Sequence, residues 1–219
     1  MKNNAKNNTT ELVFILDKSG SMTGLESDTV GGFNAMIEKQ KKSGGKCIVS
    51  TVLFSNNSTV IHDRVDINEI APMTTNDYVV GGCTALLDAI GNAIIHIANV
   101  HRYARPEDVP AHTIFIITTD GMENASVEFN RLKVTRLIKF NECEYGWEFL
   151  FLGANIDAVK EATHMGIRSE RAASWQNTSK GTERLYNTMG YVINNIAMEK
   201  ASELDDEKWK EMLKDDKDN

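Results

Sequence analysis

Apolar residues form continuous runs at three places along the chain. The first run covers residues 12–16 and stops at Asp17, the second covers residues 113–119 and is followed by Asp120, and the third covers residues 147–152. Runs of this length are typical of strands that are buried on both faces, as in parallel sheets. We therefore predict three buried strands, two of which end at an aspartate.

Between these runs, apolar side chains recur at spacings of three and four residues, which predicts amphipathic helices. The Thr-x-x-Glu sequence at 23–26 fits a capping box before the first helix, and Gly44 and Gly45 fit its end. A second helix is expected just after Thr84, a third behind residue 120, a short one near 157–163 and a last one near 182–200. The stripes consist of Val30, Phe33 and Ile37; Leu87, Ile90, Ile94 and Ile97; Val134, Leu137 and Ile138; and Leu185, Met189, Val192 and Ile196.

Two further strand-like segments, residues 47–54 and 58–65, follow each other with a very short connection. So short a connection permits only an antiparallel hairpin. Strands that alternate with helices, in contrast, fold into a parallel sheet with helices on its faces. We therefore predict an α/β fold: a Rossmann-like, doubly wound, mostly parallel sheet with one antiparallel edge strand and helices on both faces.

The chain divides into three parts by composition. Residues 1–10 are polar and rich in Asn and Lys, and they are expected to be disordered. Residues 11–200 contain all the predicted strands and helices, including the last helix, and are expected to form one domain. Residues 201–219 form a charged tail, in which we expect the few apolar side chains to pack against the same chain, with docking on a partner helix as the alternative. These side chains are Leu204, Trp209, Met212 and Leu213.

Charge and cysteine content narrow the class of protein. The chain has 219 residues and a net charge of −7, and its basic residues are scattered among acidic ones, which argues against a nucleic-acid-binding surface. No apolar run is long enough to span a bilayer, and no signal-peptide core follows the N-terminus. Cys47, Cys83 and Cys143 are widely spaced, which favours reduced thiols over a disulfide or a zinc site. We therefore expect a cytoplasmic protein that binds neither nucleic acid nor membrane.

Five oxygen-bearing side chains are predicted to meet at one edge of the sheet. Asp17 and Asp120 each follow a buried strand, and ligands of open α/β sheets gather outside the carboxyl ends of the strands. Ser19 and Ser21 lie on the loop after the first strand, and Thr84 lies in a Gly-Gly-Cys-Thr loop before a helix. Two carboxylates and three hydroxyls suit a hard divalent cation, Mg²⁺ before Mn²⁺ or Ca²⁺. An ion held by so few charges would accept a further anionic oxygen from a partner.

The pattern Asp17-x-Ser19-x-Ser21, then Thr84, then Asp120 followed by glycine resembles the metal-ion-dependent adhesion site (MIDAS) of von Willebrand factor A domains. The resemblance covers residues 11–175 and implies the same fold. It also implies that Ser19 and Ser21 bind the metal directly, that Thr84 does so in some states, and that the two aspartates act through water or hydrogen bonds. Residues 31–34, 120–126 and 152–155 are similar, more narrowly, to compact bacterial and phage members.

The resemblance implies a non-enzymatic module that binds an unidentified protein partner, because in this family an Asp or Glu of the partner completes the coordination of the metal. Residues adjacent to the five site residues are expected to form a rim that contacts the partner. They are Met22, Cys83, Gly121, Glu123 and Asn124.

Two other functions remain open from the sequence. The same carboxylates suit a Mg²⁺-dependent phosphohydrolase, although Ser19 stands where haloacid-dehalogenase-type enzymes carry a second acid. A regulatory or scaffold subunit of an ATPase-linked complex is the other alternative, by analogy with family members. Nucleotide hydrolysis is not expected, because the chain has no G-x-x-x-x-G-K-[ST] motif.

Overall fold

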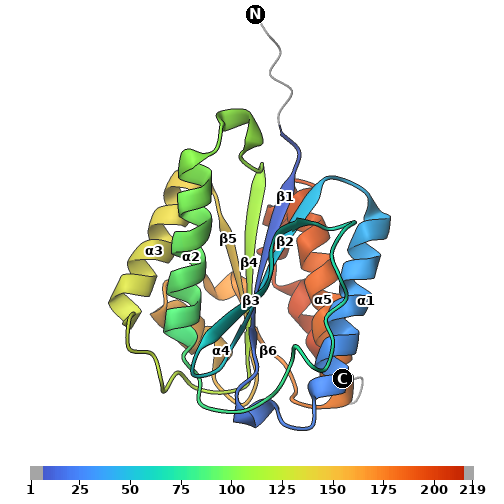
Figure 1. Cartoon of the computed structure of the whole chain (residues 1–219), viewed down its shortest axis with the longest axis vertical. Coiled ribbons are helices and arrows are strands. Elements are labelled where there is room, and N and C mark those ends of the chain that lie inside the picture. Colours follow the sequence, from blue (N-terminus) through green and yellow to red (C-terminus); the bar gives the residue numbers. More distant parts are fainter. Residues whose placement is uncertain (1–6, 215–219) are drawn as a thin grey trace, which may run out of the picture.

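The computed structural model describes residues 7–214, whose strands form a six-stranded sheet in the order β3-β2-β1-β4-β5-β6 (Figure 1). The central strand β1 pairs in parallel with β2 and β4, and the antiparallel strand is β3, at one edge. This arrangement confirms the predicted fold class. The strands are β1 (Thr10–Asp17), β2 (Cys47–Phe54), β3 (Ser58–Asp66), β4 (His112–Thr119), β5 (Glu148–Gly153) and β6 (Ala172–Ser174).

Helices cover both faces of this sheet (Figure 1). One layer contains α1 and α5, and the other contains α2, α3 and α4. Among the described helices, none combines the length and the apolar character that crossing a membrane requires. The helices are α1 (Glu26–Ser43), α2 (Leu86–Tyr103), α3 (Arg131–Tyr145), α4 (Ala158–His164) and α5 (Ser179–Ala197).

The two layers have separate hydrophobic cores because successive side chains of a strand point to opposite faces of the sheet. Along β1, Phe14 and Leu16 belong to the core beneath α1 and α5, whereas Val13 and Ile15 belong to the core beneath α2, α3 and α4. All four side chains are at most 1% exposed. Burial on both faces explains why the sequence of β1 is continuously apolar rather than alternating.

The capping box expected at Thr23 and Glu26 does not form. Helix α1 begins at Glu26, its N-cap is Leu25, and no side chain caps it. The short 3₁₀ helix η1 (Gly20–Met22) turns the chain beforehand, so that the Thr23 hydroxyl donates to the main-chain oxygen of Gly20. The Glu26 carboxylate accepts a hydrogen bond from the nitrogen of Gly24 instead. The prediction of this cap was therefore wrong.

Strand and helix residues extend into both terminal segments that were expected to lie outside the domain. Residues 1–6 of the segment expected to be disordered lie outside the described residues, and β1 begins at Thr10. In the segment expected to be a charged tail, two 3₁₀ helices, η4 (Ala201–Leu204) and η5 (Lys208–Leu213), lie against α5. Trp209 is 3% exposed and belongs to the core beneath α1 and α5. Buried Arg171 donates to the Asp205 carboxylate at 2.7 Å, which fixes this segment to the domain.

A buried carboxylate ties four elements together at the amino edge of the sheet. Glu11 of β1 is 0% exposed and forms an ion pair with Arg64 of β3. His101 of α2 donates from Nε2 to Glu11 Oε2 at 2.6 Å, and Thr113 of β4 donates to the same oxygen at 3.4 Å. Burial and the neighbouring Arg64 guanidinium lower the pKa of His101 to about 4, so it bonds as a neutral ring. This Glu11 cluster anchors the edge strand to the centre of the fold.

The contact between α1 and α5 depends on one glycine of the pair Gly31-Gly32. A Cβ on Gly32 would lie 2.3 Å from Cδ2 of buried Tyr186, whereas a Cβ on Gly31 would have no atom within 4 Å. We expect Gly32→Ala to lower the free energy of unfolding by about 1–3 kcal/mol through overpacking. Gly31→Ala, the matched control, should raise it by up to about 1 kcal/mol, because alanine favours helix. Urea denaturation of both variants tests this, and equal effects would contradict it.

Candidate metal centre

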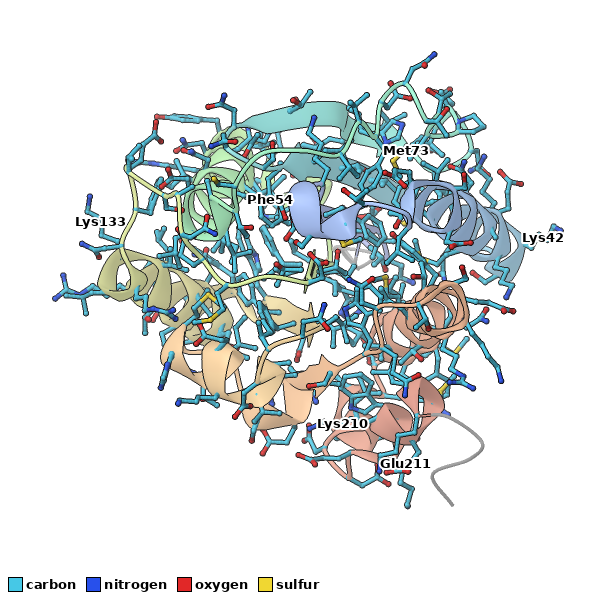
Figure 2. All side chains as sticks on the ribbon, turned by 90° about the horizontal axis from the view of Figure 1, so that it is seen from below. Lys42, Phe54, Met73, Lys133, Lys210 and Glu211 are labelled. Atoms are coloured by element: carbon cyan, nitrogen blue, oxygen red, sulfur yellow. The ribbon has the colours of Figure 1, made fainter. Side chains whose placement is uncertain are left out.

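Asp17 is the last residue of β1, and its carboxylate points into the protein. Oδ1 accepts a hydrogen bond from the nitrogen of Ser19 at 2.7 Å, and Oδ2 accepts one from the Thr119 hydroxyl at 2.6 Å. The Tyr78 hydroxyl donates to the main-chain oxygen of Asp17. Figure 2 views this carboxyl edge from below, with Phe54, the last residue of β2, near the middle. The two oxygens of Asp17 thus hold the loop at Ser19 and the end of β4 at Thr119, which suits a residue that orients ligands.

Ser19, Ser21 and Asp120 form a chain of hydrogen bonds across this edge. The turn η1 brings the two serine hydroxyl oxygens to 3.1 Å from each other, and Ser21 Oγ donates to Asp120 Oδ1 at 2.5 Å. A hydroxyl that gives its proton to a carboxylate keeps the lone pairs of its oxygen for another partner. The arrangement therefore leaves serine oxygens available to a cation.

Thr84 reaches the same place from the loop between β3 and α2. Gly82 has a φ of 84°, a conformation that favours glycine, and its oxygen accepts a hydrogen bond from the nitrogen of Gly20 at 3.0 Å. A Cβ on Gly121 would lie 3.4 Å from Thr84 Oγ1 and 3.5 Å from Ser21 Oγ, so both hydroxyls border Gly121. The structure thus brings the five predicted site residues together at the carboxyl edge.

The electrostatics of this edge favour a bound cation. Burial raises the pKa of Asp17, and burial together with the charge of Asp17 raises the pKa of Asp120. The hydrogen-bond donors to these carboxylates are neutral hydroxyls and amides, which offset only part of the cost. Within the described part of the chain, no three His, Cys, Asp or Glu side chains form a metal cluster, so a cation here would need the hydroxyl oxygens as well. Such a donor set fits Mg²⁺ and other oxygen-seeking ions.

These raised pKa values predict how the stability of the metal-free protein depends on pH. The contribution of Asp17 and Asp120 to stability is complete below the ordinary carboxyl pKa of 3.8 and is lost as the pH rises through the raised values. We expect Mg²⁺ to offset this loss, so its effect on Tm relative to EDTA should grow from about pH 4 to about pH 8. Thermal unfolding of the wild type and of Asp120→Asn, which should show a weaker trend, tests this. A Mg²⁺ effect independent of pH would contradict it.

Three residues of the site were not found from the sequence. The Asn177 amide donates to Asp120 Oδ2 at 2.7 Å, so this carboxylate is held from both sides. At Asp17, the Thr119 hydroxyl donates to the carboxylate and the Tyr78 hydroxyl donates to the main-chain oxygen. Thr119 ends a predicted strand and could have been found by its position, whereas Asn177 follows β6, a strand that the pattern did not predict.

The expected rim residues have different environments. Met22 is 5% exposed and belongs to the hydrophobic core, so placing it on a partner-binding rim was wrong. Cys83 is exposed, and Gly121 lies beside the hydroxyls of the site. The side chains of Glu123 and Asn124 accept hydrogen bonds from nearby main-chain nitrogens. Glu123 accepts from the nitrogens of residues 87, 125 and 126, and Asn124 accepts from the nitrogen of residue 84.

Solved structures with a similar fold include a von Willebrand factor type A protein. A von Willebrand factor type A protein from Catenulispora acidiphila has a TM-score of 0.56 and 14% identity over 84% of this chain and 42% of its own. Proximal thread matrix protein 1 from the mussel byssus has a TM-score of 0.57 and 15% identity over 86% of this chain and 46% of its own. The same mussel protein, solved with a zinc-occupied MIDAS motif, has a TM-score of 0.52, 13% identity, and coverage of 86% and 45%.

These likenesses confirm the predicted resemblance at the level of the fold: the chain has a von Willebrand factor A-like α/β fold. It spans less than half of the length of these solved chains. No family model matches the sequence, and the search of curated proteins found no match. The narrower similarity to bacterial and phage members stays a prediction.

Proposed function

We propose that this chain is a divalent-metal-dependent protein-binding module. In this proposal the metal lies among Asp17, Ser19, Ser21, Thr84 and Asp120 and coordinates an Asp or Glu side chain of a partner protein. The observation that carries the proposal is the hydrogen-bonded chain from Ser19 through Ser21 to Asp120, which leaves hydroxyl oxygens free at a partly buried, negatively charged edge.

The donor set supports Mg²⁺ as the metal, with Mn²⁺ and Ca²⁺ as alternatives, because all five side chains offer oxygen. Bound there, the ion would supply a positive charge that neutral hydroxyls neutralise only weakly, so it would attract a carboxylate from outside. The serines and Thr84 would provide ligands, and the two aspartates would orient them and carry the negative charge. A cytoplasmic location is consistent with three free cysteines.

A phosphohydrolase is the weaker alternative. A nucleophilic aspartate needs an oxygen free to attack phosphorus, whereas both oxygens of Asp17 accept hydrogen bonds and the residue is 1% exposed. Ser19 offers no acid in place of a second aspartate. A screen of phosphate esters with Mg²⁺ decides between the two functions, since turnover that Asp17→Asn abolishes would favour the enzyme.

The proposed function is tested by binding with and without metal. The chain, immobilised in Mg²⁺, is exposed to lysate of its native cell and eluted with EDTA, in parallel with Asp17→Asn and Ser19→Ala. The proposal expects a protein that the wild type retains, that EDTA releases and that neither variant captures. A partner that binds equally after EDTA treatment and to both variants would refute it.

A further inference from the structure

The loop that follows Asp120 is hydrogen-bonded along the first turns of α2. The Glu123 carboxylate accepts from the nitrogen of Leu87 at 2.8 Å, and the Ser126 hydroxyl accepts from the nitrogen of Asp88 at 3.0 Å. In return, the Asp88 carboxylate accepts from three main-chain nitrogens of the loop, at residues 127, 128 and 129. These bonds make the loop and the start of α2 one unit.

Asn124 links this unit to Thr84, which lies two residues before α2. The side-chain oxygen of Asn124 accepts a hydrogen bond from the main-chain nitrogen of Thr84 at 2.9 Å. The main-chain nitrogen of Asn124 donates to the main-chain oxygen of Thr84 at 3.1 Å. Two bonds on the two sides of one residue fix both of its peptide units. Because the backbone sets the direction of the Cα–Cβ bond and limits the allowed rotamers, Asn124 also restricts where the Thr84 hydroxyl beside Gly121 lies.

We propose that Asn124 is a positioning residue, which holds the Thr84 hydroxyl at the metal. This inference rests on the proposed function of the site. The loop with Ser19 and Ser21 is bonded to Asp120 through Ser21 and to the loop before Thr84 through the nitrogen of Gly20 and the oxygen of Gly82.

This role differs from that of a rim residue in its expected effect. A residue that contacts only the partner would leave metal affinity unchanged when it is replaced. A residue that orients a ligand costs about 10–100-fold in metal affinity when it is lost. Asn124 is exposed, so its replacement by alanine should leave the fold intact. Met122, on the same loop and 60% exposed, provides a matched control.

A double-variant cycle on the full chain, with Mn²⁺ binding measured by calorimetry, tests whether Asn124 acts through Thr84. We expect Asn124→Ala to weaken Mn²⁺ binding about 10-fold in the wild type and less than about 2-fold in Thr84→Val. Met122→Ala should change the affinity less than about 2-fold in either background. An equal loss from Asn124→Ala in both backgrounds, or no loss in the wild type, would overturn the inference.

Amide hydrogen exchange separates failure of this inference from failure of the proposed function. The Thr84 amide should exchange at least about 10-fold faster in Asn124→Ala than in the wild type, with or without metal. Unchanged exchange would overturn the positioning role while leaving the metal site untouched. Absence of Mn²⁺ binding by the wild type would instead overturn the proposed function, and the role of Asn124 toward a metal with it.

Discussion

Affinity for Mg²⁺ is expected to fall at least about 100-fold when Asp120 is replaced by Asn. The substitution keeps the size of the side chain and removes one of the two carboxylate charges of the site. It also weakens the acceptor of the Ser21 proton, since the bond from Ser21 to Asp120 at 2.5 Å is made to a charged group. Calorimetry of Mg²⁺ binding, with circular dichroism to verify the fold, measures the effect.

Thr23→Ala is the control for this prediction. Thr23 also carries a hydroxyl on the loop after β1, but its hydroxyl donates to the main-chain oxygen of Gly20 at an exposed position. Its removal should change the affinity for Mg²⁺ less than about 3-fold. If Asp120→Asn also binds Mg²⁺ within about 3-fold of the wild type, Asp120 does not belong to a metal site.

The largest effect on stability is expected for Glu11→Ala, which should lower the free energy of unfolding by about 3–5 kcal/mol. The substitution removes the acceptor that Arg64, His101 and Thr113 share. It also leaves the Arg64 guanidinium, whose side chain is 20% exposed, without its counter-charge. Chemical denaturation measures the change.

Glu38→Ala serves as the comparison, because Glu38 also forms an ion pair, with Lys41 at 2.7 Å, but its side chain is 56% exposed. Its loss should cost at most about 1 kcal/mol. A double variant, Glu11→Leu with Arg64→Met, should recover much of the stability by replacing the buried charges with apolar volume. If Glu11→Ala costs no more than Glu38→Ala, the Glu11 cluster does not anchor the edge strand.

The strands buried on both faces were among the predictable parts of the fold. Strands such as β1 and β4 show as apolar runs because neither face meets water, and their sharp ends at Asp17 and Asp120 located the candidate site. The hairpin of β2 and β3 followed from two strand-like segments, and their short connection gave the antiparallel pairing. A strand that is buried on both faces has a distinctly apolar sequence, so such strands can be predicted without knowledge of the tertiary contacts.

The unpredicted part consists of features that sequence patterns do not specify. Strand β6 is three residues long and consists of two alanines and a serine, so no run marks it, and the position of Asn177 after it could not be inferred. The polar side chains of Glu123 and Asn124 can form hydrogen bonds with solvent or with main-chain amides. Only the folded loop shows that they accept hydrogen bonds from main-chain amides. Met22 stands next to Ser21 in sequence but turns into the core.

The edges of the sheet restrict how another protein can bind. Strand β3 presents charged side chains such as Asp63 and Asp66, its pairing with β2 is irregular, and Arg64 has a φ of 52°. The opposite edge, β6, is only three residues long. Irregular, charged or very short edges discourage the addition of a foreign strand. Association by sheet extension, whether with another protein or in aggregates, is therefore disfavoured at both edges of the sheet.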